Sequence, residues 1–317
     1  PIIKNARHST WTFDFAPHDA GRYPILNGNV YGMNDQYKKD KTPGNPAQIV
    51  NNNESHPPYY YYRNDESIYY FDAQMPVEEC GNMIIMSYVA SKKLNNKKFI
   101  LENIDLFEKW VKYLEKFGQD PDEQLCTDDF AGHLAHNANL SAKSICGIEA
   151  YALMNKFIGK KDTYIQYHNK AKLYAKNWEK QANRIDHTCL AFDKEEGWSL
   201  KYNLIWDIYF KSNLFSKRLF QKEIDWYLKQ NNKYGTPLDS RETYTKSDWE
   251  VWTTCFTSDI NKRKIIYKGI ENFITLSKDR VPFGDWYKTD SGRNVGFYAR
   301  SVQGGCFATI LFDSNKK

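Results

Sequence analysis

The chain has 317 residues, of which 41% are hydrophobic and 16% aromatic, so it can bury the core of one or two globular domains. Its net charge of +5 is not gathered into long basic runs, which argues against nucleic-acid binding. No apolar stretch approaches the roughly 20 residues that a membrane-spanning helix needs, so we expect no membrane insertion.

The first 75 residues differ in character from the rest. Prolines recur between Pro17 and Pro58 among many glycine, asparagine and aspartate residues, and such punctuation excludes long helices. We predict that residues 1–75 form ordered loops lying on a larger body. Their aromatic side chains are compatible either with a pocket wall or with simple packing of the loops.

After Pro76 the sequence is typical of helices of two kinds that alternate along the chain. Helices that are apolar on most sides, and so expected to be buried, are predicted at 77–94, 140–157, 200–210 and 249–256. Amphipathic helices with one apolar face are predicted from Ile100, Ile104, Phe107, Val111 and Leu114, from Tyr164 to Trp178, and from Ile266, Ile270, Phe273 and Ile274. A last apolar helix is expected at 302–311.

This alternation predicts helical hairpins in series, with the buried helices inside and the amphipathic helices outside. Such hairpins can close into a ring. Four hairpins and a ninth helix fall short of the twelve helices of a full six-hairpin ring. We therefore expect either an open ring or further helices upstream of Pro1.

Acidic and imidazole side chains gather in the stretch that follows Thr127. Asp128 and Asp129 lie in a polar turn, and His133 and His136 follow before a hydrophobic helix. Such a group is typical of a rim where general acids and bases meet a substrate. The histidines could also bind a metal with Asp129, but no third His or Cys lies close in sequence, so we expect no metal and no cofactor.

Two other groups of acids precede predicted buried helices. Glu78 and Glu79 follow Pro76, where acids favour a helix N-terminus but could also point into the mouth of a ring. Ser247 and Glu250 match a capping box, which gives Glu250 a structural role and leaves Asp248 to face the pocket. If the ring closes, Glu79, Asp129 and Asp248 meet at one end, and we predict these three as the catalytic acids.

Further candidates for substrate binding surround these acids in the sequence. Arg241 could clamp a carboxylate in bidentate fashion, and Lys201, predicted on one helix with Trp206 and Asp207, could recognise an anionic group. The full set of expected substrate-binding residues is Glu78, Asp128, His133, His136, Trp198, Lys201, Trp206, Asp207, Arg241, Trp249, Asp285 and Trp286. Asp285 and Trp286 are predicted in a polar loop, and Arg300 at the start of the last helix.

Nucleophilic catalysis has little support. No G-x-S-x-G elbow occurs, and the six cysteines include no CxxC pair. Free, mostly buried thiols are the favoured interpretation. A pair of Cys126 with His133 is conceivable, but nothing in the sequence activates that thiol.

Several segments resemble the motifs of the glutaminase A family, in the same order and with similar gaps. They are MPVEECGNMIIM (75–86), LCTDDFAGHLAHNANLSAKSICGI (125–148), GWSLKYNLIWD (197–207), YGTPLDSRETYTKSDWEVWT (234–253), PFGDWYKTDSG (282–292) and GFYARSVQGG (296–305). FAPHDAGRYPILNGNVYG (15–32) is similar to the loop that precedes the six-hairpin domain of that family. The resemblance covers nearly the whole chain.

The resemblance implies an all-α, (α/α)6 six-hairpin toroid over residues 76–317, a β-rich domain upstream, and a secreted or periplasmic protein. It also implies hydrolysis of L-glutamine to glutamate and ammonia. Two alternatives stay open: a glycan-active enzyme, because six-hairpin toroids are mostly glycosidases, and a non-catalytic module that binds a carbohydrate or peptide. For an enzyme we expect one carboxylate to activate water and a second to protonate the leaving group, with Arg241 or Lys201 holding the α-carboxylate of glutamine. For a sugar, two acids roughly 6.5–9.5 Å apart would invert the anomeric centre.

Overall fold

Helical hairpins build most of the computed structural model, which describes residues 2–7, 11–18, 74–279 and 281–314. A short helix, α1 (Ile2–Ala6), precedes the hairpins α4 (Pro76–Lys93) with α5 (Lys97–Phe117) and α6 (Ala138–Ile158) with α7 (Lys161–Ala182). The turn η3 (Tyr202–Leu204) leads into α8 (Ile205–Phe210), which is followed by α9 (Lys217–Gln230). A fourth hairpin joins α10 (Ser247–Thr254) to α11 (Ile260–Leu276). Most of the predicted loop segment 1–75 lies outside the described residues.

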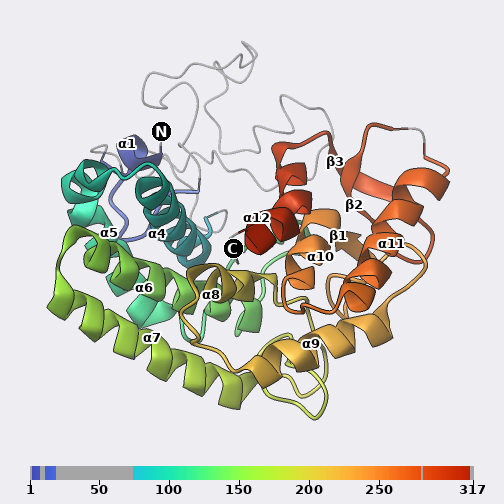
Figure 1. Cartoon of the computed structure of the whole chain (residues 1–317), viewed down its shortest axis with the longest axis horizontal. Coiled ribbons are helices and arrows are strands. Elements are labelled where there is room, and N and C mark those ends of the chain that lie inside the picture. Colours follow the sequence, from blue (N-terminus) through green and yellow to red (C-terminus); the bar gives the residue numbers. More distant parts are fainter. Residues whose placement is uncertain (1, 8–10, 19–73, 280, 315–317) are drawn as a thin grey trace, which may run out of the picture.

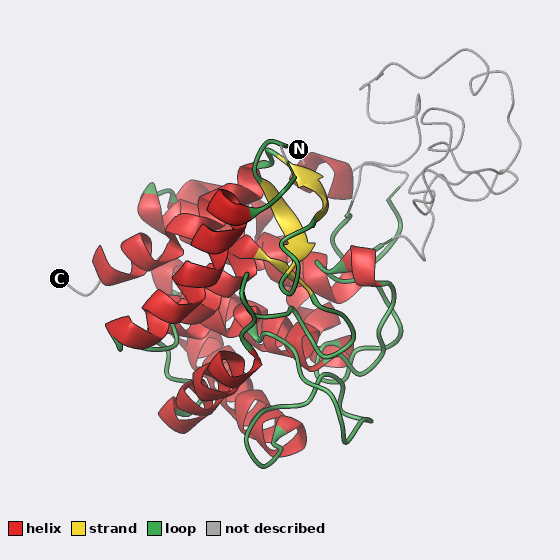
Figure 2. Cartoon of the chain, turned by 90° about the vertical axis from the view of Figure 1, so that its right-hand side faces the viewer, coloured by secondary structure: helices red, strands yellow, loops and turns green. Residues whose placement is uncertain are grey.

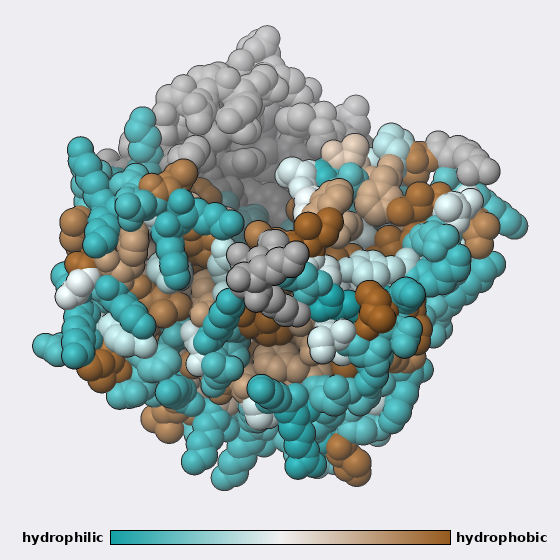
Figure 3. Space-filling model, viewed as in Figure 1, coloured by the Kyte–Doolittle hydropathy of each residue, from teal (hydrophilic) through white to brown (hydrophobic). Residues whose placement is uncertain are grey.

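The hairpins form an arc with an inner and an outer layer. Figure 1 shows α4, α6, α8, α10 and α12 (Ala308–Ser314) toward the centre, with α5, α7, α9 and α11 around them. The inner helix α6 is buried on nearly every side, whereas α5 buries only one face, from Ile100 to Leu114. The lower rim of the molecule, formed by α7 and α9, is mostly hydrophilic in Figure 3. The prediction of alternating buried and amphipathic helices is confirmed. The placement of Ile274 on the apolar face of its helix is wrong, because this residue is 59% exposed.

Side-chain caps define several of the helix starts. The Asn137 carboxamide accepts hydrogen bonds from the N–H groups of Asn139 and Leu140 at the start of α6, and Asn96 accepts one from Phe99 in α5. Ser216 and Asp259 cap α9 and α11 in the same way. These polar residues stop each helix from extending into the preceding turn, which keeps the hairpins short and antiparallel.

Two glycines allow the inner helices α4 and α6 to approach closely. A Cβ atom added to Gly147 would lie 3.1 Å from the Cα of Gly81 and 2.8 Å from a methyl group of Leu114. A Cβ atom on Gly81 would lie 2.7 Å from Cγ of Lys143. The absence of a side chain at Gly81 therefore lets the Lys143 chain run along α4 toward its first turn.

A small antiparallel sheet accompanies the fourth hairpin. It comprises β1 (Tyr244–Lys246), β2 (Gly284–Lys288) and β3 (Asn294–Tyr298) in the order β1-β2-β3, and Figure 2 shows it beside the helices. In the register of the first pair, Lys246 lies opposite Trp286. The expected polar loop at Asp285 and Trp286 is thus a strand, and the expected last helix is the turn η4 (Ser301–Phe307) followed by α12.

Within the described residues, no helix is both long and apolar enough to cross a membrane. The six cysteines are free, and all except Cys306 are buried, as the sequence predicts.

Candidate active site

A buried carboxylate begins the candidate site at the N-terminus of α4. Pro76 occupies the first turn of this helix, and Glu78, two residues later, is only 1% exposed. Its Oε1 atom accepts a hydrogen bond from Thr127 and lies 2.9 Å from Nζ of Lys143, which comes from α6. Oε2 of Glu78 has no hydrogen-bond partner among the residues that the structure describes. Lys143 therefore lies as a counter-ion beside the buried Glu78, and Oε2 of Glu78 is left for another group.

A second buried acid, Asp128, follows Thr127 directly. Its Oδ2 atom accepts a 2.8 Å hydrogen bond from the hydroxyl of Tyr202, whereas Oδ1 has no partner within the described part of the chain. Burial raises the pKa of Asp128 to about 7, although the Tyr202 hydrogen bond acts in the opposite direction. The negative charge of Glu78 raises this pKa further, as expected for two neighbouring carboxylates. Asp128 can therefore hold a proton near neutral pH, beside the ion pair of Glu78 with Lys143.

The ring of Tyr202 connects Asp128 with α10. It stacks on Trp249, with ring centroids 4.3 Å apart and planes inclined by 9°. Trp249 is 9% exposed, and its Nε1 donor lacks a partner among the described residues. A ligand that lies against this stack could therefore form hydrogen bonds with the carboxyl group of Asp128 and with the indole N–H of Trp249.

A cluster of two cations and two acids lies beside this stack, where β1 runs into α10. Lys246 forms an ion pair with Asp285, which also accepts hydrogen bonds of 3.3 and 2.6 Å from Arg300. Burial would raise the pKa of Asp285, but the two cations outweigh it and lower the pKa. Asp248 lies 3.9 Å from Nζ of Lys246, and burial raises its pKa to about 6. Lys246 also lowers the pKa of Asp128, which places the two acid groups within electrostatic reach of each other.

Aromatic side chains cover the outer side of this cluster. Phe130 contacts Trp286, with centroids 4.6 Å apart, and Phe297, at 5.9 Å. The guanidinium of Arg300 lies 3.8 Å above the ring of Phe297, and Nζ of Lys246 lies 5.2 Å from the same ring. These partly exposed rings cover Lys246, whose side chain is 4% exposed, and form a wall on which a ligand could pack.

Glu79 and Asp129, the expected catalytic acids next to Glu78 and Asp128, are less buried as whole residues than these neighbours. Glu79 is partly exposed, and burial of its carboxyl raises its pKa to about 7, against the attraction of His18. Asp129 accepts a hydrogen bond from the N–H of Phe130 and so helps to form η2 (Asp129–Ala131). Asp248 is buried in the cation cluster. The structure thus gathers acids from all three predicted segments. In the first two segments the more buried acid is the neighbour of the expected one: Glu78 instead of Glu79, and Asp128 instead of Asp129.

The histidines and Arg241 are placed differently from the expectation. Nδ1 of His136 lies 2.8 Å from Asp120, on the outside of the loop, and His133 is exposed. Arg241 donates bidentate hydrogen bonds of 3.1 and 2.8 Å to Asp239 and a third to the carbonyl of Ala131. Arg241 therefore fastens two loops of the site, and its carboxylate clamp is already occupied by Asp239.

The prediction that Lys201, Trp206 and Asp207 share one helix is wrong, because η3 interrupts it. Nζ of Lys201 donates to the carbonyl and hydroxyl oxygens of Ser199, and burial lowers the pKa of this lysine. Trp198, the candidate just before it, is buried. Its ring packs 6.3 Å from those of Trp226 and Tyr227.

Trp206 packs against Trp252 on α10, with centroids 5.6 Å apart. Asp207 accepts hydrogen bonds from the N–H groups of Leu214 and Phe215 and so shapes the α8–α9 loop. Neither Lys201 nor Asp207 joins the acid cluster.

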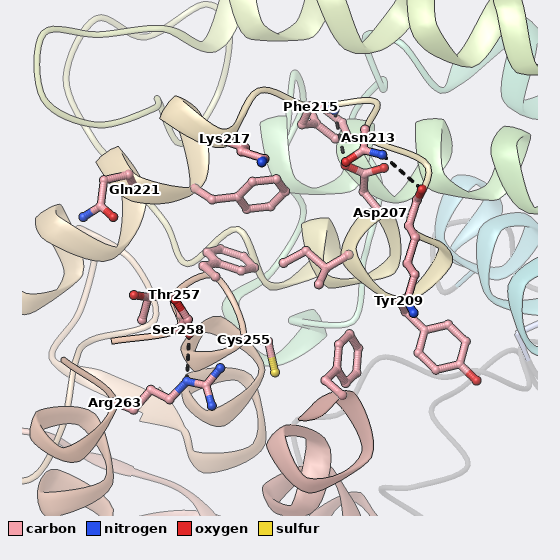
Figure 4. Close-up of a pocket in the computed structure, with 15 residues that line it drawn as sticks. Asp207, Tyr209, Asn213, Phe215, Lys217, Gln221, Cys255, Thr257, Ser258 and Arg263 are labelled. Carbon is pink, nitrogen blue, oxygen red and sulfur yellow. Dashed lines mark hydrogen bonds between the residues drawn. The ribbon is translucent and has the colours of Figure 1, made fainter. Parts of the chain in front are cut away.

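Asp207 borders a separate cavity of about 460 Å³, which none of the clustered acids lines. Figure 4 shows Asp207 and Asn213 on one side of it and Arg263 on the other. Arg263 bonds to the carbonyls of Thr254 and Thr257 and to Asp313. Since the protein itself binds the charged groups of Asp207 and Arg263, neither is left to act on a ligand in this cavity.

The capping box predicted at Ser247 and Glu250 is wrong in its geometry. Lys246 is the N-cap of α10, and Ser247 is already helical. Glu250 instead accepts hydrogen bonds from the N–H of Thr236 and the hydroxyl of Tyr287. Burial raises the pKa of Glu250 to about 8. Its structural role, as predicted, is to tie α10 to the sheet.

Sequence reasoning missed the cations of the site. Lys143 is a charged residue inside an otherwise apolar helix, and that isolation was a usable signal of a buried acid partner. Lys246 and Arg300 gave no such signal, because their shared partner Asp285 is distant in sequence. Tyr202 likewise could not be distinguished from a core aromatic.

Comparisons with known proteins agree with the helical-hairpin fold. A family model described as "Glutaminase A six helical-hairpin domain" matches residues 1–310. The chain is similar to glutaminase A of Aspergillus oryzae, with 34% identity over 247 residues, which covers 76% of this chain and 36% of that protein. It is also similar to a protein of Arthroderma benhamiae named probable glutaminase, with 31% identity over 249 residues, covering 68% of this chain and 29% of the relative. The chain thus spans about a third of the length of these relatives.

Proposed function

Because this chain belongs to the glutaminase A family, we propose that it hydrolyses the side-chain amide of L-glutamine to glutamate and ammonia. The observation that carries the proposal is the pair Glu78 and Asp128. Both carboxyl groups are buried, each has one oxygen fixed by a neighbour, and each keeps a second oxygen without a partner among the described residues. A general base and a general acid acting on one amide need this arrangement.

Glu78 is the proposed base. Lys143 forms an ion pair with Oε1, and Oε2 would take a proton from the attacking water. Asp128 is the proposed acid. Since Oδ2 accepts the Tyr202 hydroxyl, the proton of neutral Asp128 resides on Oδ1. The acid–base set expected from the sequence was Glu79, Asp129 and Asp248. The proposal replaces Glu79 by its neighbour Glu78, and Asp129 by its neighbour Asp128.

The steps balance as follows. Water adds to the amide carbon and gives a proton to Glu78, and the C–N bond breaks as Asp128 gives its proton to the departing nitrogen. The carboxylic acid so formed returns a proton to Asp128, and Glu78 passes its proton to ammonia. The products are glutamate and ammonium, and both side chains regain their starting states.

Amide variants of the four neighbouring acids test this assignment. Glu78→Gln and Asp128→Asn should each lower ammonia release from L-glutamine about 10²- to 10⁴-fold, the usual contribution of a general acid or base. Glu79→Gln and Asp129→Asn are the matched neighbours and should stay within about tenfold of wild type. Full activity of Glu78→Gln together with loss in Glu79→Gln would move the base to Glu79. Circular dichroism melting curves establish that each variant is folded.

A glycan-active enzyme is the second candidate, favoured by the partly exposed rings of Phe130, Trp286 and Phe297, because aromatic faces stack on sugars. A screen of glutamine, asparagine and a glycan panel separates the two activities. Cleavage of a glycan without release of ammonia would overturn the glutaminase proposal. Binding without turnover would favour a non-catalytic module. A secreted or periplasmic location and a preceding β-rich domain remain proposals that rest on the family resemblance alone.

A further inference from the structure

The two cations of the cluster beside the proposed acid–base pair are shared unevenly between its two acids, Asp285 and Asp248. Asp285 is completely buried and binds both Lys246 and Arg300. These two cations meet one carboxylate, so Lys246 keeps further N–H donors directed away from Asp285. Both cations lie against the ring of Phe297.

Asp248 supplies the opposite charge at the same place. It is 1% exposed, and its Oδ1 atom has no hydrogen-bond partner in the described part of the chain. The 3.9 Å between Oδ1 and Nζ of Lys246 is too long for a hydrogen bond. A buried acceptor and a buried donor therefore stand next to each other without satisfying each other, which is costly unless a ligand bonds to both.

We propose that Lys246, Arg300 and Asp248 bind the zwitterionic end of an α-amino-acid substrate, the cations holding its α-carboxylate and Asp248 its α-ammonium. This inference rests on the proposed function, since it gives glutamine its orientation. It replaces Arg241 and Lys201 as the expected carboxylate binders. Arg241 has a carboxylate to itself in Asp239, and Lys201 bonds to Ser199, whereas Lys246 and Arg300 share the one carboxylate of Asp285. It also turns Asp248 from a catalytic acid into a specificity residue.

The path from this clamp to the acid–base pair follows one stacked pair of rings. Trp249 is the residue after Asp248, and it stacks on Tyr202, whose hydroxyl reaches Asp128. A substrate held at Lys246 would lay its methylene chain along Trp249 and bring its amide to Asp128. The indole N–H of Trp249, which has no acceptor among the described residues, lies on this path and can donate to the amide oxygen.

The charge state of Asp248 agrees with this role. Burial raises its pKa, and the positive charge of Lys246 opposes the rise, leaving a pKa of about 6. Asp248 is therefore mostly ionised at neutral pH, as an ammonium-binding carboxylate must be.

Two analogues of glutamine test the clamp. Glutaramate lacks only the α-ammonium, and 4-aminobutanamide lacks only the α-carboxylate. For wild type, kcat/KM for L-glutamine should exceed that for either analogue about 10³-fold or more, because each leaves buried charges unpaired. Asp248→Asn should reduce the preference for glutamine over glutaramate by about 10²-fold. Arg300→Met should raise KM for glutamine and glutaramate alike and leave 4-aminobutanamide unchanged, and Arg300→Lys should restore part of the loss.

Ratios measured within one variant are insensitive to how much of the protein is folded. A wild-type glutamine-to-glutaramate ratio in Asp248→Asn would overturn the clamp and leave the proposed function standing. If wild type releases no ammonia, the proposed function fails, and calorimetric titration with L-glutamine and glutaramate tests the clamp by itself. Absence of L-glutamine binding to wild type in that titration would overturn it.

Discussion

Nζ of Lys143 and Oε1 of Glu78 lie 2.9 Å apart, and their side chains are only 6% and 1% exposed. The pair joins two inner helices that have no direct sequence connection. It places a cation beside the proposed base and also fixes the start of α4 against α6.

Removal of the lysine should therefore be costly. In Lys143→Met, Glu78 would remain as a buried charge without its cation, and the free energy of unfolding should fall by about 3–5 kcal/mol. Lys112→Met is the control, since Lys112 forms a 2.7 Å pair with Glu108 on the exposed side of α5 and should cost less than about 1 kcal/mol. Urea denaturation measures both. Equal losses of unfolding free energy in the two variants would mean that the buried Lys143–Glu78 pair stabilises the protein no more than the exposed pair does.

Gly81→Ala tests the close approach of α4 and α6. Alanine favours helix by about 1 kcal/mol, but the new Cβ would lie 2.7 Å from Cγ of Lys143 and displace it. We expect a net loss of about 1–3 kcal/mol together with lower activity. Gly304→Ala, which has nothing within 4 Å of its added Cβ, should change stability by less than about 0.5 kcal/mol. A stabilised, fully active Gly81→Ala protein would contradict the packing argument.

Tyr202→Phe should shift the pH profile of activity. The Tyr202 hydroxyl lowers the pKa of Asp128, so its loss should raise that pKa above about 7. If neutral Asp128 is the acid, activity is present below this pKa and lost as the pH rises through it. The alkaline limb of kcat in Tyr202→Phe should therefore move to higher pH. An unchanged limb with a lower kcat would indicate that another group titrates.

Glu250 should make the protein less stable toward alkaline pH. Its pKa rises from an ordinary value of 4.5 to about 8 in the folded protein, because it is buried. The folded state holds this proton more tightly, so its stabilising effect is complete below pH 4.5 and is lost as the pH rises to about 8. Glu250→Gln should flatten this part of the stability curve. Denaturation at several pH values compares the two proteins, and parallel curves would show that Glu250 does not cause the decline.

Thiol labelling should distinguish the cysteines. Cys126 and Cys146 are fully enclosed, and burial raises the pKa of both thiols well above the ordinary value. Only Cys306 is partly exposed among the six. In native protein an aromatic disulfide reagent should label at most one thiol rapidly, and Cys306→Ser should remove that phase. Rapid labelling of several thiols would contradict the burial.

The helices could be predicted because their signals are local. The faces of α5 and α7 repeat at helical spacing, and Asn137 and Asn96 mark helix starts within a few residues. The break at Tyr202–Leu204 could not be predicted, since it depends on hydrogen bonds from Asn203 to Asn139 on α6, 64 residues away. The apolar run around it is equally compatible with an unbroken helix.

The sequence predicted which segments form the site, but not which residue of each segment takes part. Acids were expected at the start of three inner helices, and all three segments contribute to the cluster. Which acid of each pair bonds to a neighbouring element depends on packing: Glu78 rather than Glu79 forms the ion pair with Lys143. The meeting of Lys246 with Asp285 needs the pairing of β1 with β2 across 39 positions, for which the sequence offers no local mark.

That pairing has a consequence for engineering the protein. β1 continues without a break into α10, so the strand register also fixes the rotation of the helix that carries Asp248, Trp249 and Glu250. A one-residue slip of β2 against β1 would exchange the two faces of β2 and so move Asp285 away from Lys246. A change of register at this position would therefore alter the charge distribution of the site without altering any of its amino acids.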